Sequence, residues 1–219
     1  EKFIIKEIKN NEKLAKKFKN YFSQYYENIS VNEYILEVDK IFLSYLGRNG
    51  FISYNQAFDF GDEISSYLNS IKDLAYSKNK SIVFELIDYI LKRVQTVDMD
   101  DSLGTSIQII DSLFDMLELL IDETDKYEQL YNQIFKYILK LYDNPNIYAY
   151  DSRWDAFFYD FFLEKEYLLK KLNFVDKKIN ELEKSRKRHF SEPYIIKSNL
   201  MIILNYPENE IIKFLKKNS

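Results

Sequence analysis

Apolar residues recur at helical spacing through the middle of the chain, between residues 59 and 142. Four successive stripes repeat every three or four residues, so each falls on one face of a helix whose other positions are polar. The stripes are Phe60, Ile64, Leu68, Ile71 and Ala75; Val83, Leu86, Ile87, Ile90, Val94 and Val97; Leu103, Ile107, Ile110, Phe114, Leu117 and Ile121; and Tyr127, Leu130, Ile134, Ile138 and Leu141. Short polar joints separate them, which predicts two antiparallel helix hairpins.

The stripes also recur along the chain. Phe60 and Leu103 are 43 residues apart, and Val83 and Tyr127 are 44 apart. A period of this length is typical of paired-helix solenoids. The predicted fold is therefore all-α, with antiparallel helix pairs stacked as an irregular α-solenoid of the HEAT or TPR kind. An irregular helical bundle is the alternative, because the spacing recurs and the residue identities do not.

Three segments organise the chain. Residues 1–50 hold a basic N-terminal stretch and a helix that Ser30 and Glu33 begin as a capping box. Residues 51–143 hold the two hairpins, and residues 144–219 hold further helices after Pro145, which cannot continue a helix. We expect one continuous all-α domain or two poorly separated ones. Gly61 lies inside a helical pattern, which predicts the close approach of another helix.

Composition narrows the chemistry. The 219 residues include no Cys and one His, so disulfides and ordinary zinc sites are excluded. The formal charge of −4 disfavours a protein that coats DNA, and no apolar run approaches the roughly 20 residues of a membrane span. The N-terminus has no secretory signal pattern. We expect a cytoplasmic protein without a cofactor, cut from a longer protein because it begins at Glu1.

The acidic joint at residues 98–104 has a partial likeness to a calcium loop. Such a loop needs Gly at its sixth position and Glu at its twelfth, where this chain has Leu103 and Ile109. We expect Asp101 or Ser102 to cap the following helix instead.

Charge is distributed unevenly. Residues 98–128 hold ten acidic residues and one Lys, whereas residues 165–188 hold nine basic and four acidic residues. Lys184, Arg186, Lys187 and Arg188 form a basic run that could contact nucleic-acid phosphates. Cations are also favoured at a helix C-terminus, so a structural explanation competes with the functional one.

The aromatic segment from Trp154 to Phe162 is expected to be a core helix. If Trp154 is exposed, it becomes a candidate anchor for a partner protein.

Catalytic chemistry has little support in the sequence. His189 is the only histidine and lies in a cationic run, which disfavours a general base. Carboxylate pairs at helical spacing, such as Asp59 with Glu63 and Asp111 with Asp115, arise readily on charged helices. We therefore expect no enzyme activity and no metal site. A carboxylate-based, metal-assisted enzyme is the remaining catalytic alternative.

One resemblance adds context. The stretch from Arg48 to Glu63, with Ala57-Phe58-Asp59-Phe60-Gly61-Asp62 at its centre, resembles the helical region that follows the zinc finger of bacterial SWIM zinc-finger proteins. The likeness continues at Phe84-Glu85-Leu86, at Asp100-Asp101-Ser102 with Gly104, and from Tyr206 to Leu215, so it covers residues 48 to 217. The family's zinc ligands are absent, so no functional residue is carried over. The resemblance implies the helical part of such a protein without its DNA- or protein-binding metal module.

These observations favour a non-catalytic helical interaction or scaffold module of a bacterial protein. A protein partner is expected. The alternative is a nucleic-acid-associated adaptor that uses the basic helix at residues 165–188.

The segregated charge also predicts how copies of the chain interact. Head-to-tail contacts between acidic and basic segments are screened by salt, so we expect a monomer at physiological ionic strength and weak association below it. Sedimentation or light scattering across a salt series measures this. A dimer that persists at about 1 M NaCl would show an apolar interface instead, because salt of that strength screens charges beyond about 3 Å.

Overall fold

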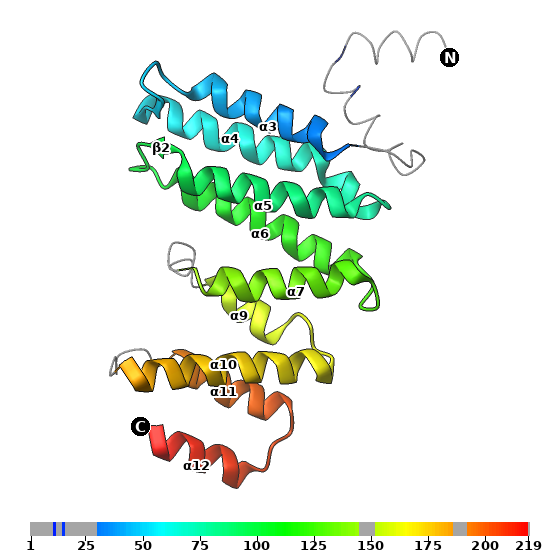
Figure 1. The fold of residues 1–219 in the computed structure, drawn as a ribbon, viewed down its shortest axis with the longest axis vertical. Helices are drawn as coiled ribbons and strands as arrows, with labels where there is room; N and C mark the ends of the chain where they lie inside the picture. Colours follow the sequence, from blue (N-terminus) through cyan, green and yellow to red (C-terminus); the bar gives the residue numbers. More distant parts are fainter. Residues whose placement is uncertain (1–10, 12–14, 16–29, 145–151, 186–191, 219) are drawn as a thin grey trace. The chain divides into compact units, whose positions relative to one another are not determined.

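The computed structural model describes residues 11, 15, 30–144, 152–185 and 192–218 (Figure 1). The chain folds as two compact units, Glu1–Ile134 and Phe135–Ser219. The division falls inside a helix, so it does not coincide with the expected boundaries at residues 50 and 143. Apart from Asn11 and Ala15, the basic stretch at residues 1–28 lies outside the described residues.

The predicted all-α class is confirmed. Unit 1 contains α3 (Val31–Tyr45), α4 (Tyr54–Ile71), the 3₁₀ helix η2 (Lys72–Tyr76), α5 (Lys80–Thr96) and α6 (Thr105–Glu123). The helix α7 (Gln129–Tyr142) passes from unit 1 into unit 2, which continues with α9 (Ser152–Tyr159), α10 (Lys165–Ser185), α11 (Glu192–Ile203) and α12 (Glu208–Asn218). Among the described residues, no helix combines the length and hydrophobicity that a membrane span requires.

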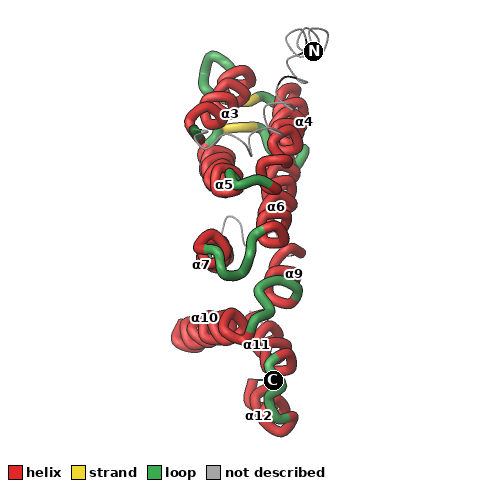
Figure 2. Tube along the Cα trace, turned by 90° about the vertical axis from the view of Figure 1, so that its right-hand side faces the viewer, coloured by secondary structure: helices red, strands yellow, loops and turns green. Residues whose placement is uncertain are grey.

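Unit 1 is built from two layers of helices. The helix α3 packs on α4, and α5 packs on α6; across these pairs, α3 contacts α5 and α4 contacts α6. Figure 2 shows α3 and α5 in one layer and α4 and α6 in the other. The pairing is shifted by one helix from the predicted hairpins, because short joints predict antiparallel neighbours but do not decide which neighbours share most surface.

Two short strands join the pairs at one end of unit 1. Strand β1 (Phe51–Ile52) precedes α4 and pairs in parallel with β2 (Asp98–Met99), which precedes α6. The amide of Asp100 extends the ladder by donating to the carbonyl of Ile52 at 3.0 Å. The sequence gives no hairpin signal for this pairing, because parallel strands are joined through helices and need no tight turn. The strands place the beginnings of α4 and α6 side by side.

The predicted stripes form most of the core. Every member of the first stripe is buried, and so are most members of the other three. Leu103, Ile107 and Tyr127 are exposed, contrary to expectation. Leu103 and Tyr127 lie outside the helices, because α6 begins at Thr105 and α7 at Gln129. Ile107 is on the solvent side of the first turn of α6.

The N-terminal caps of the helices agree only in part with those predicted from the sequence. Ser30 caps α3 as predicted, and its hydroxyl accepts a hydrogen bond from the amide of Asn32 at 3.3 Å. Gly104, not Asp101 or Ser102, occupies the cap position of α6, with a φ of 72° that glycine adopts readily. Asp101 still contributes, because its carboxylate accepts from the amide of Ser106 at 2.8 Å.

At Gly61, α6 approaches α4 closely, as predicted. A Cβ at this position would lie 3.0 Å from the Cγ2 of Thr105 and 2.9 Å from the Oε1 of Gln108. Both Gly61 and Thr105 are buried. The absence of a side chain therefore sets the spacing of the two helices.

Unit 2 has an aromatic core. The ring of Tyr142 makes edge contacts with Trp154, Phe158 and Phe174, at centroid distances of 5.4, 5.3 and 5.7 Å. Phe135 makes similar contacts with Phe162 and Tyr167. The helix α11 packs against α9, α10 and α12. The aromatic segment is thus a core helix, as expected.

Replacing Gly61 tests the close approach. In Gly61→Val, the added methyl groups would collide with Thr105, and overpacking of this kind costs about 1–3 kcal/mol. Urea unfolding of the variant should show that loss. Ser66→Val, on the exposed side of the same helix, is the matched control and should change the free energy of unfolding by about 0.5 kcal/mol or less. Equal stability of the two variants would contradict the role of Gly61.

Candidate protein-binding face

The basic run predicted from the sequence is described only at its beginning. Lys184 is exposed near the end of α10, whereas Arg186, Lys187 and Arg188 lie outside the described residues. Two other cations of α10 form ion pairs. Lys170 pairs with Glu166 at 2.6 Å, and Lys178 pairs with Asp143 at 2.7 Å and with Glu181 at 3.3 Å. The described part of the helix is therefore partly neutralised within the chain.

Trp154 is not an exposed anchor. Its side chain is 0% exposed and packs against the ring of Tyr142. The proposal depended on exposure, so it is wrong for this structure. The aromatic density of the segment gives the physical reason, because rings of this size contribute most to the folding free energy when they are buried together.

Lys171 is a buried lysine that the sequence did not single out. Its side chain is 0% exposed, and its ammonium donates to the carbonyls of Phe157, Phe158 and Phe161 at the end of α9. Burial lowers the pKa of Lys171 to about 7, although Glu164 and Asp160 act in the opposite direction. The carbonyls of Phe157 and Phe158 belong to the last turn of α9, which lacks intrahelical donors for them, and the carbonyl of Phe161 follows the helix. The arrangement is thus a helix cap, enclosed in the core.

The layer formed by α4 and α6 carries charge of one sign. The two helices contain eight acidic residues and no Lys or Arg. These residues are Asp59, Asp62, Glu63, Asp111, Asp115, Glu118, Asp122 and Glu123. The layer of α3 and α5 differs, because it holds five acidic and four basic residues. Asp39 and Asp88 there pair with Arg93 and Lys92.

Hydrogen bonds fix the register of α4 against α6. The side-chain Nε2 of Gln108 donates to the carboxylate of Asp62 at 2.7 Å, and the hydroxyls of Ser65 and Ser112 are 2.9 Å apart. Both helices begin at the β1–β2 end and run in the same direction (Figure 1). Phe58, one turn before Asp62, therefore lies opposite the beginning of α6.

Four large apolar side chains remain exposed at this end. Tyr54 and Phe58 of α4 are 51% and 54% exposed, and Leu103 and Ile107 at the beginning of α6 are each 48% exposed. We call these four residues the anchor patch. Asp62 lies one turn after Phe58 and Asp111 one turn after Ile107, a spacing that places side chains on the same side of a helix. An apolar group with a polar rim is typical of a surface that binds another protein.

The turn beside the anchor patch is held by its own acidic residues. Asp100 accepts hydrogen bonds from the amide and the hydroxyl of Ser102, and these bonds lower the pKa of the Asp100 carboxyl. The turn does not assemble a calcium loop. Among the described residues, no group of three or more His, Cys, Asp or Glu side chains is arranged to hold a metal ion.

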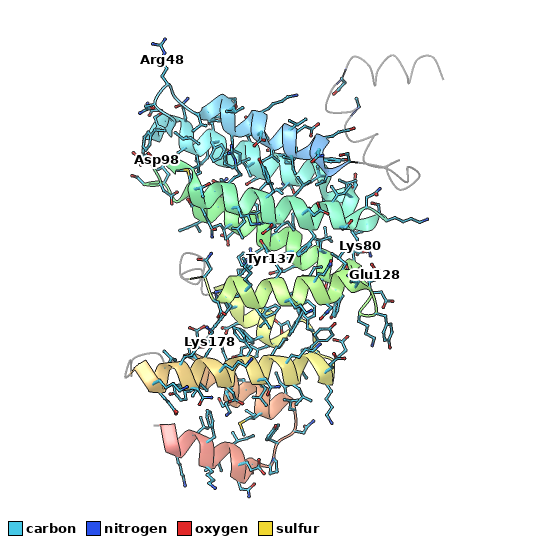
Figure 3. The ribbon with its side chains drawn as sticks, in the orientation of Figure 1. Arg48, Lys80, Asp98, Glu128, Tyr137 and Lys178 are labelled. Atoms are coloured by element: carbon cyan, nitrogen blue, oxygen red, sulfur yellow. The ribbon has the colours of Figure 1, made fainter. Side chains whose placement is uncertain are left out.

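Figure 3 shows how the ends of unit 1 differ. Asp98 lies at the end where α4 and α6 begin. Arg48, in the turn between α3 and β1, extends away from the same end. At the opposite end, Lys80 contacts Glu128 at 3.1 Å and also donates to the carbonyl of Glu123. A lysine thus offsets the acidity at the end of α6, far from the anchor patch.

The carboxylate pairs considered for catalysis belong to this same layer. Asp59, Glu63 and Asp115 are exposed on their helices, and Asp111 is half-buried. Glu63 accepts a hydrogen bond from the hydroxyl of Tyr45, which raises the pKa of Tyr45 to about 12. The pairs lie along helix surfaces, so the enzyme alternative stays a prediction with no observation to favour it.

Comparisons of the chain with protein-family models, with curated proteins and with solved structures find no match. The resemblance to the helical region of SWIM zinc-finger proteins therefore stays an expectation.

The cap formed by Lys171 predicts a pH dependence of stability. The folded pKa near 7 lies below the ordinary value of 10.5, so the unfolded chain binds more protons between these pH values. Stability contributed by Lys171 is therefore lowest below pH 7 and rises with pH across that window. The slope approaches about 1.4 kcal/mol per pH unit.

Urea unfolding from about pH 7 to pH 9.5 should show this rise in the native chain and not in Lys171→Met. Lys165→Met, at an exposed position on the same helix, is the control and should keep the native slope. Parallel pH profiles for the native chain and Lys171→Met would show that the ammonium stays charged on its three carbonyls.

Proposed function

We propose that the chain is a non-catalytic, helical interaction module that binds a protein partner through the outer face of α4 and α6. The anchor patch carries this proposal. Four apolar side chains, each about half exposed, lie at the beginnings of two neighbouring helices that contain eight acidic residues and no Lys or Arg. Isolated exposed apolar residues are normal on a protein surface, whereas a group with a charged rim is a feature of binding sites.

The geometry of unit 1 supports this role. The close contact at Gly61 and the hydrogen bonds of Gln108 with Asp62 and of Ser65 with Ser112 hold α4 against α6. The anchor residues therefore lie on rigid helices or in a turn that Asp100 and Asp101 stabilise. A surface that is ordered before binding loses less conformational entropy when it binds.

The nucleic-acid alternative has no comparable observation among the described residues. Lys170 and Lys178 are paired with acidic side chains and Lys171 is buried, so α10 offers fewer exposed cations than its sequence suggests. The acidic layer of unit 1 would repel a phosphate backbone. Direct binding to DNA or RNA stays a prediction from the run that Lys184 begins.

Site-specific photo-crosslinking tests the protein-binding role. A photo-reactive phenylalanine analogue placed at Phe58 or Ile107 should capture a discrete protein in cells that express the chain. The same analogue at Leu36 or Leu43 on α3 is the matched control, because these residues are apolar and at least as exposed. The captured protein, once purified, should bind the native chain and bind Phe58→Ser at least about tenfold more weakly.

Two results would contradict the role. One is equal capture from the α3 positions, which would indicate contact without a preferred face. The other is a purified partner whose affinity is unchanged by Phe58→Ser and by Ile107→Ser.

A further inference from the structure

The outward side of α3 is apolar. Leu36 and Leu43 are 60% and 64% exposed, the largest exposed fractions among large apolar side chains of the described helices. They are seven residues apart, so they lie on one side of the helix, with the exposed Lys40 between them. The opposite side faces α4 and α5 and holds the buried residues of the helix, which are Tyr34, Val38, Ile41 and Phe42. A helix surface that points away from the core is normally polar, so this one is suited to an apolar occupant.

We propose that residues 13–26 of the same chain cover this side of α3, packed on it as an antiparallel helix. Residues 1–29 directly precede the cap of α3, and all of them except Asn11 and Ala15 lie outside the described part of the chain. The docked segment is separate from the partner proposed for α4 and α6, and neither depends on the other.

The sequence of residues 13–26 has the apolar pattern of a helix with one buried side. Five apolar or aromatic residues share a stripe at helical spacing, and they are Leu14, Phe18, Tyr21, Phe22 and Tyr25. The four Lys of this stretch occupy other positions. The amide of Ala15 donates to the carbonyl of Asn11 at 2.8 Å, which is the hydrogen bond of an α-helical turn. An isolated helix of this length is marginal in water, so its apolar stripe needs a surface to pack on.

The length of the joint decides which residues meet. Residues 27–30 alone separate the segment from α3, and short joints between helices produce antiparallel neighbours. Leu14 and Tyr21 are seven residues apart, as are Leu36 and Leu43. A reversal of the chain centred on the joint therefore places Tyr21 opposite Leu36 and Leu14 opposite Leu43. Both pairs are matched at once because each spacing corresponds to about 10 Å along a helix.

The covalent connection favours this occupant over a separate molecule. A segment joined to its binding surface by a short linker has an effective concentration in the millimolar range. An interaction with a Kd of about 1 mM between separate molecules would therefore be substantially occupied within one chain. Weak apolar contacts along two turns of α3 are sufficient under these conditions.

Pairs of introduced cysteines test the register, because the chain has no Cys of its own. Leu14→Cys with Leu43→Cys should form a disulfide within one chain under mild oxidation. Tyr21→Cys with Leu36→Cys should do the same. Leu14→Cys with Leu36→Cys is the matched control, and it should react at least about tenfold more slowly because the two residues are displaced by about 10 Å along the helix. Mass spectrometry of proteolytic fragments identifies each disulfide.

Limited digestion with trypsin tests the native segment without cysteines. Cleavage after the Lys residues of 13–19 requires the segment to leave α3, so its rate reports the undocked fraction. Leu36→Ser with Leu43→Ser should speed this cleavage at least about tenfold. Ile195→Ser with Ile202→Ser is the matched control and should change the rate by about twofold or less. These two residues of α11 have the same seven-residue spacing and are 54% and 58% exposed. Circular dichroism checks that each variant is folded.

Two results would overturn the docking. One is a control cysteine pair that reacts as fast as the two matched pairs. The other is cleavage of the Leu36/Leu43 variant at the native rate. Disulfides that join two chains would also overturn it, because a second copy would then cover α3. If the segment is docked, a photo-reactive group at Leu36 should crosslink to residues 13–26 of its own chain and capture no other protein.

Discussion

The close approach of α4 and α6 is the constraint on which the rest of unit 1 depends. Gly61 has no side chain, and the space is filled by Thr105 and Gln108 of α6. This contact allows the hydrogen bond between Gln108 and Asp62, and the β1–β2 pairing then holds the beginnings of both helices together. Because the two helices run side by side from the same end, their first turns lie next to each other. The anchor patch is a consequence of that register.

Helical periodicity predicted the buried residues better than it predicted the ends of the helices. Apolar residues at helical spacing in the middle of a helix lie on one face, and that face packs on the core. Residues such as Ile64 and Leu117 were therefore correctly predicted to be buried. Leu103 and Ile107 satisfied the same spacing, but both are exposed. Leu103 precedes α6, which Gly104 caps in a left-handed conformation, and Ile107 lies on the solvent side of the first turn. Local propensity and apolar spacing did not predict the pairing of β1 with β2 either, because the two strands are 47 residues apart in sequence.

The candidate site was only partly visible in the sequence for a related reason. The excess of acidic residues at 98–128 was apparent, but α4 contributes Asp59, Asp62 and Glu63 from a separate stretch. A count of charges over one continuous stretch does not combine these residues with those of α6, because the two sets come together only when α4 packs on α6. Trp154 showed the converse problem. Aromatic neighbours in sequence are compatible with a buried Trp154 and with an exposed one. The structure shows that it is buried against Tyr142.

The contrast between the two layers of unit 1 has an energetic consequence. Like charges one turn apart on a helix destabilise it by about 0.2–0.5 kcal/mol per pair, and salt screens much of that repulsion. The pairs Asp59 with Glu63 and Asp111 with Asp115 therefore cost a little stability, which the buried stripes beneath them outweigh. In the layer of α3 and α5, Arg93 and Lys92 offset comparable charges.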